Sequence, residues 1–125
     1  MSGEAMLVTL LLLQLKHLMA DFFWQTRWMV ENKGQYGHPG GWAHAAVHGG
    51  ASAVILGLLA PISLGLVLAI CLVECVVHYH IDWIKEQAVK RSGAGPTEKR
   101  FWNITGTDQA LHQATYLAMV AMIYL

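Results

Sequence analysis

Four stretches of this sequence each contain two side chains that can bind metal ions, spaced four residues apart. The pairs are His17 with Asp21, His44 with His48, His78 with Asp82, and Asp108 with His112. In an α-helix, residues four apart lie on the same face one turn apart, so each pair would point in one direction. Imidazole combined with carboxylate suits zinc, iron or manganese. These eight residues are therefore the candidate metal ligands.

Eight ligands exceed the four that a tetrahedral zinc ion needs, so the set predicts a divalent transition metal, zinc first, bound as two ions with open positions. Two neighbouring ions can lower the pKa of a bound water and hold a phosphoryl or acyl oxygen during hydrolysis. Asp82 and Asp108 are the catalytic candidates, one to bridge the ions and the other to act as general base. Iron and manganese are the alternative metals.

The composition indicates a membrane environment for these pairs. Of the 125 residues, 55% are hydrophobic and 13% are charged, against roughly 25% charged in an ordinary soluble domain. A chain this short could not bury so much apolar surface in water, and it has room for one domain, residues 1–125. The formal net charge is zero, which gives no electrostatic basis for nucleic-acid binding.

Four apolar stretches predict an all-α fold, a transmembrane bundle of four helices. The predicted helices cover residues 5–33, 42–60, 63–91 and 107–125. A helix needs about 20 residues to cross the hydrocarbon core of a bilayer, and each apolar stretch is near that length. Each of the four carries one of the His/Asp pairs.

The connections between these helices predict the topology. A tight turn at residues 60–62 lies on one side with both termini, whereas the longer loops, 34–41 and 92–106, lie on the other. The long-loop side carries Arg27, Lys33, Lys85, Lys90, Arg91, Lys99 and Arg100, and the terminal side carries only Glu4. Basic residues in short loops stay in the cytoplasm. We therefore expect a multi-pass protein of the inner membrane, with both termini outside and all four pairs at one depth beneath the cytoplasmic face.

Several of these residues have alternative roles. The histidines could simply form hydrogen bonds between helices. Residues 105–108 have the pattern of a capping box, in which Asp108 would cap a helix. Asp21 and Asp82 could form ion pairs with Lys16 and Lys85.

Other polar residues near the pairs are candidates for supporting roles. Glu74, one turn before His78, could orient that imidazole or remain protonated in the core. Gln25 and Gln109 could orient the carboxylates. His80 lies on another helix face, and His38 lies in a loop, so we expect both to lie outside the site.

The order of these motifs resembles the DUF3307 family of small bacterial and phage membrane proteins, whose function is unknown. The resemblance rests on Lys16-His17-xx-Ala20-Asp21-Phe22-xx-Gln25, His44-xxx-His48, His78-xxx-Asp82-xx-Lys85 and Asp108-Gln109-xx-His112. More distantly, the pattern is similar to the membrane-bound metal-dependent hydrolases. That likeness implies an all-helical, histidine-rich site for hydrolysis.

The resulting hypothesis is a metal-dependent hydrolase acting on a lipid-linked or lipid-soluble ester or phosphoester. Its expected partners are membrane lipids and a lipid-like substrate, with a homo-oligomer left open. The alternatives are non-enzymatic: metal or haem binding for electron transfer, or transport of an ion or proton through the polar layer.

Overall fold

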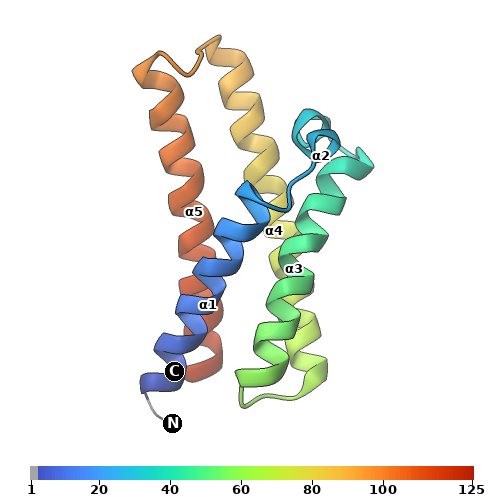
Figure 1. Cartoon of the computed structure of the whole chain (residues 1–125), viewed down its shortest axis with the longest axis vertical. Coiled ribbons are helices and arrows are strands. Elements are labelled where there is room, and N and C mark those ends of the chain that lie inside the picture. The colour runs from blue at the N-terminus through green and yellow to red at the C-terminus, as the bar shows by residue number, and fades with distance from the viewer. Residues whose placement is uncertain (1–2) are drawn as a thin grey trace.

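The computed structural model describes residues 3–125, and these residues form five α-helices without a strand. The helices are α1 (Gly3–Phe22), α2 (Arg27–Asn32), α3 (Pro39–Leu59), α4 (Leu64–Ser92) and α5 (Lys99–Tyr124). The four long helices form a ring in which α1 packs on α3 and α5, and α4 packs on the same two neighbours (Figure 1). The predicted all-α class is confirmed.

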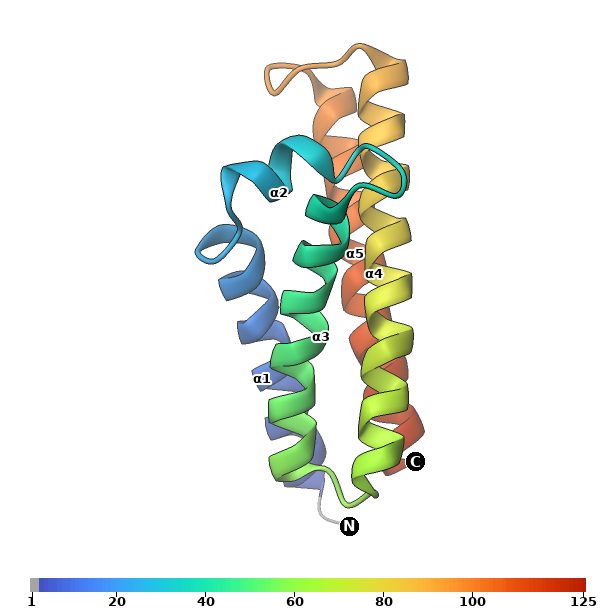
Figure 2. The same cartoon turned by 90° about the vertical axis from the view of Figure 1, so that its right-hand side faces the viewer.

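The first predicted helix, residues 5–33, is wrong in its second half. Helix α1 ends at Phe22, and α2 begins only after Thr26. Thr26 has an extended backbone, and its hydroxyl accepts a hydrogen bond from the Met29 backbone N–H. An N-cap of this kind starts a new helix because it satisfies a free N–H group. Helix α2 therefore leaves the direction of α1 and lies across the start of α3, below the α4–α5 connection (Figure 2).

The last helix also differs from its prediction. Helix α5 begins at Lys99 rather than at residue 107. The Thr107 hydroxyl donates to the carbonyl of Asn103, within the helix. Asp108 is thus an interior helical residue, and its alternative role in a capping box is wrong.

The two middle helices lie close to their predicted limits. His38 caps α3 through its Nδ1, and Pro39 occupies the first turn, where a missing N–H does no harm. Helix α4 ends at Gly93, which has a φ of 65°. Glycine adopts this left-handed conformation without strain, so it is a common helix stop.

Three of the described helices, α1, α3 and α4, are long and apolar enough to cross a membrane. Many large apolar side chains on them point outward, including Leu11, Leu58 and Leu72. An apolar surface of this extent indicates a membrane protein. The expected fourth span, α5, does not meet the same criterion, and it carries several polar residues along its length.

The bundle has an apolar end and a polar end. The start of α1, the end of α5 and the α3–α4 turn lie together, whereas α2 and the α4–α5 connection lie at the opposite end (Figure 1). A buried apolar core fills the part nearest the termini. It comprises Leu13, Leu56, Val67, Cys71, Tyr116, Met119, Val120 and Ile123. The His/Asp pairs therefore lie between this core and the end that carries α2.

Helices α3 and α4 approach closely at Gly49. A Cβ atom at this position would lie 2.1 Å from Cys75 Sγ and 3.1 Å from the backbone oxygen of Cys71. Small residues allow membrane helices to pack at short distance. At the same level, the rings of His48 and His78 stack with centroids 3.8 Å apart. The glycine thus permits the approach that brings these two histidines together.

We predict that Gly49→Ala destabilises the bundle by about 1–3 kcal/mol, because the added methyl group overpacks the α3–α4 contact. Gly50→Ala is the matched control, since a Cβ there meets nothing within 4 Å. Unfolding of both variants in mixed micelles, followed by circular dichroism, measures the difference. Equal stability of the two variants would show that the close approach is unimportant.

Candidate metal centre

All four long helices deliver ionisable side chains to one buried layer. Each of the eight candidate ligands contacts at least one other member of the set. The five histidines, Asp82 and Asp108 are buried, and only Asp21 is partly exposed. His78 lies among the others, with its ring centroid 4.2 Å from that of His112. The structure therefore brings the predicted residues together.

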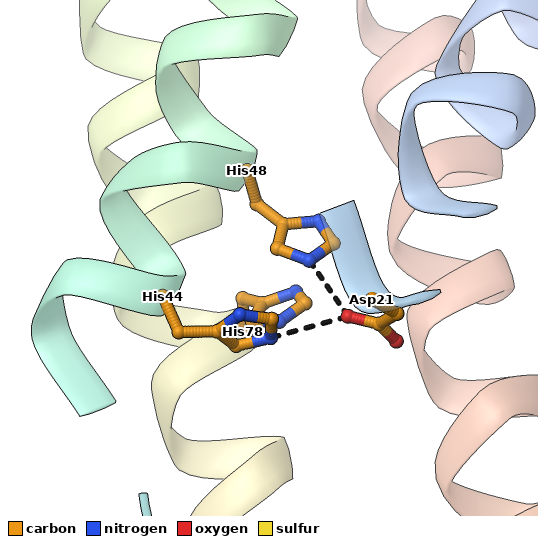
Figure 3. A group of neighbouring side chains, drawn as sticks. All are labelled: Asp21, His44, His48 and His78. Atoms are coloured by element: carbon orange, nitrogen blue, oxygen red, sulfur yellow. Dashed lines mark hydrogen bonds and ion pairs between the residues drawn. The ribbon is translucent and has the colours of Figure 1, made fainter. Parts of the chain in front are cut away.

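One group within this layer joins α1 to α3. Asp21 Oδ1 lies 2.9 Å from His48 Nε2 and 3.1 Å from His44 Nε2. Figure 3 shows both imidazoles directed at this carboxylate, with His78 beside them. One ligand atom from each of the four residues lies within 4.8 Å of all the others, which is close enough to surround a metal ion.

A second group joins α4 to α5. Asp82 Oδ1 lies 3.1 Å from His112 Nε2, and Asp82 Oδ2 lies 3.4 Å from His78 Nε2. These three residues also have ligand atoms within 4.8 Å of one another. Asp82 Oδ2 is 3.3 Å from His44 Nε2, so this carboxylate connects the second group to the first.

His78 belongs to both groups, and assigning it to the second gives two sets of the same composition. Asp21, His44 and His48 then form one set, and His78, Asp82 and His112 form the other. Each has two imidazoles and one carboxylate. Three protein ligands of this kind leave positions open on zinc or iron, as catalytic sites require.

His17 and Asp108 lie beside these sets rather than within them. Both nitrogens of His17 already have partners: Nδ1 is 2.8 Å from the Tyr116 hydroxyl, and Nε2 is 3.0 Å from Gln109 Oε1. The same Nε2 lies 3.1 Å from Asp21 Oδ2. His17 is thus placed to orient Asp21, whereas metal ligation by His17 would require these contacts to rearrange.

Asp108 contacts the second set through one oxygen and its helix neighbour through the other. Its Oδ1 lies 3.4 Å from His112 Nε2, and its Oδ2 accepts a hydrogen bond of 3.0 Å from Gln109 Nε2. Gln109 therefore links His17 to Asp108, which is the orienting role expected of it. Gln25 differs, because it donates to the backbone carbonyl of Asp21 and accepts a hydrogen bond from the Lys33 ammonium at 3.1 Å.

Several buried polar atoms in this layer make no hydrogen bond among the described residues: both ring nitrogens of His44, Nε2 of His78, Oδ2 of Asp82 and Oδ1 of Asp108. All of them except His44 Nδ1 nevertheless lie 3.1–3.4 Å from a carboxylate or imidazole of the same layer. Buried polar groups normally complete their hydrogen bonds, so this shortfall suggests a site for an ion.

Two lysines, Lys16 and Lys33, contact the layer. Lys16 forms an ion pair with Glu74 and does not pair with Asp21. Its ammonium also donates to His48 Nδ1 at 3.3 Å and to the His48 carbonyl at 3.2 Å. The sequence does indicate this pair, because Lys16 and Glu74 lie in separate apolar helices. Charged residues are expected inside such helices only where they pair.

The second lysine is Lys33, the C-cap of α2, whose ammonium lies 3.8 Å from Asp82 Oδ2. Lys85 instead pairs with Glu86, so the alternative prediction that it pairs with Asp82 is wrong. The break after α1 returns Lys33 to the polar layer, and no local pattern in the sequence predicts this. His38 and His80 lie outside the layer, as expected.

We predict that Glu74→Ala lowers stability by about 3–5 kcal/mol, because it leaves the Lys16 ammonium buried without a counter-ion. The double substitution Lys16→Met with Glu74→Met should recover most of this loss. Glu31→Ala, which removes an exposed pair with Arg27, should change stability by less than about 1 kcal/mol. Unfolding titrations in mixed micelles compare the variants, and a double variant as unstable as Glu74→Ala would contradict the ion-pair explanation.

Comparison with known proteins places the chain in one family. The family described as "Protein of unknown function (DUF3307)" matches residues 7–125, which include all eight candidate ligands. No curated protein and no solved structure matches the chain. The more distant resemblance to metal-dependent hydrolases has no support among these matches. The chain belongs to the DUF3307 family.

Proposed function

We propose that this protein is a metal-dependent hydrolase of the inner membrane, acting on a lipid-linked or lipid-soluble ester or phosphoester. The observation that carries the proposal is the pair of adjacent donor sets, each with two imidazoles and one carboxylate. Asp21, His44 and His48 would hold one zinc ion, and His78, Asp82 and His112 would hold another. Two sets with open positions side by side are typical of two-metal hydrolytic sites.

Bound zinc would supply a Lewis acid and a water of lowered pKa. Asp82 Oδ1 is 3.1 Å from His112 of its own set, whereas Oδ2 is 3.4 Å from His78 of that set and 3.3 Å from His44 of the other set. Asp82 is therefore the candidate for the bridging carboxylate. Asp108, which lies outside both sets and has its Oδ1 3.4 Å from His112 Nε2, is the candidate for the general base that accepts a proton from the attacking water.

The membrane placement proposed with this function uses all four long helices as spans. Helix α5 would be the fourth, because it closes the ring between α1 and α4 and contributes His112 to the buried layer. The basic residues around α2 and the α4–α5 connection favour a cytoplasmic location for that end. The site would then open at the inner leaflet, where a lipid substrate could reach it.

The non-enzymatic alternatives are less compatible with the packing. The His78 ring stacks on that of His48 at 3.8 Å and lies tilted against that of His112 at 4.2 Å, which leaves no space between them for a haem. A transport path would have to continue past the polar layer. The buried Lys16–Glu74 pair extends the polar interior, but the apolar core around Leu13 and Leu56 then closes the bundle.

The metal content is the first test. We expect the purified, zinc-replete protein to contain about two equivalents of zinc, one per donor set. His48→Ala should lose roughly one equivalent, because it leaves the first set with two ligands. His80→Ala is the control, since that imidazole bonds to Tyr36 outside the layer. Less than about one equivalent by elemental analysis, or no change in His48→Ala, would refute the metal site.

The hydrolytic role has a separate test. Asp108→Asn should retain zinc, because Asp108 lies outside both donor sets, yet it should lower kcat by about 10²–10⁴-fold through loss of the general base. Asp21→Asn should lose both metal and activity. Hydrolysis of chromogenic alkyl esters and alkyl phosphodiesters in mixed micelles provides the measurement. Full activity in Asp108→Asn would remove this residue from the mechanism.

A further inference from the structure

A groove of about 310 Å³ lies between α4 and α5, next to the second donor set. Its principal lining residues are Ile81, Ile84 and Lys85 of α4 with Ile104, Asp108 and Leu111 of α5. Ligand pockets in proteins range over roughly 300–1,000 Å³. The groove is therefore large enough for part of one elongated ligand.

The groove runs from the surface of the bundle to the polar layer. Ile84 is 58% exposed and Leu111 is 49% exposed, so these side chains lie at its open side. Asp108 is only 6% exposed and lies at its buried side. The Asp108 Oδ1 atom has no hydrogen-bond partner and is 3.4 Å from His112 Nε2. A ligand in the groove would thus have one part against isoleucine and leucine and another part at the donor set.

The groove contains one cationic side chain. Lys85 lines it, and its ammonium lies 2.7 Å from Glu86 Oε1. An anionic group bound in the groove would compete with Glu86 for this ammonium. Apolar walls with a single cation near the polar end match an amphiphile that has one hydrocarbon chain and an anionic head group.

We propose that this groove binds the chain of an anionic single-chain lipid and places its head group at the Lys85 ammonium, beside the second donor set, because the Asp108 carboxylate at the buried side would repel a second anion. Ile84 and Leu111 lie at the opening, so such a ligand can enter from the side of the bundle between α4 and α5. The proposal deepens the proposed function by naming the substrate class, and the hydrolysis of this lipid rests on that function. Binding of the lipid in the groove does not rest on the proposed function, because the groove is present without the metal.

The test uses the full chain in nanodiscs and dodecyl phosphate with a photoreactive diazirine on its chain. We expect labelling, mapped by mass spectrometry, to concentrate at residues 81–88 and 103–111. Ile84→Trp combined with Leu111→Trp should fill the groove and lower this labelling by more than about tenfold, since the chain loses its apolar contacts. Both positions are exposed, so the fold should tolerate the larger rings, and circular dichroism checks this.

Leu72→Trp is the matched control, because Leu72 is 67% exposed on the same helix but outside the groove. It should leave labelling unchanged. Labelling spread evenly over the exposed apolar residues of all helices would overturn the proposal, and so would labelling that the groove-filling substitutions do not reduce. A dimer in native mass spectrometry that the groove-filling substitutions abolish would assign the surface to a homo-oligomer instead.

The head-group preference has its own comparison. A diazirine probe with a neutral maltoside head should label the groove less than the phosphate, and Lys85→Gln should remove most of that difference. Equal labelling by both probes in the unsubstituted protein would contradict the proposal that the groove prefers an anionic head group. The experiments are run on metal-free and zinc-loaded protein. Groove labelling without hydrolysis would reject the enzyme and keep the lipid site, whereas hydrolysis without groove labelling would reject the lipid site alone.

Discussion

The whole arrangement depends on the need to pair charged side chains inside an apolar bundle. An aspartate at the centre of a membrane helix costs about 2.5–3.5 kcal/mol on insertion scales, and this chain places Asp21, Asp82, Asp108 and Glu74 among apolar helices. Each of them contacts a histidine or lysine from its own or a neighbouring helix. The pairing restricts how far the helices can slide past one another, because a shift of one turn would separate the partners.

Packing around the layer follows from this requirement. Gly49 allows α3 to approach α4 closely enough for His48 and His78 to stack. Helix α1 ends just after Asp21, and the chain then returns through α2, so that Lys33 reaches Asp82. The apolar core keeps the other half of the bundle closed. Polar chemistry is thereby confined to one end of the molecule, near the groove between α4 and α5.

Each of the two donor sets comes from one pair of helices. Helices α1 and α3 supply Asp21, His44 and His48, whereas α4 and α5 supply His78, Asp82 and His112. The remaining members, His17 and Asp108, come from α1 and α5, the helices that give only one ligand each. Gln109 contacts both of these remaining residues. Their position beside the sets suits residues that orient a ligand or move a proton.

Helical periodicity sets the direction of each side chain, and alternating helix direction sets its depth. The amino-acid pattern therefore predicts the helical class, the i, i+4 pairing and the convergence of the pairs at one end. Which atoms meet depends on the tertiary structure. It paired Lys16 with Glu74, gave Asp108 an interior helical position, ended α1 at Phe22 and left His17 outside both donor sets. These outcomes depend on distances between helices, which close contacts such as the one at Gly49 set and which no local pattern encodes.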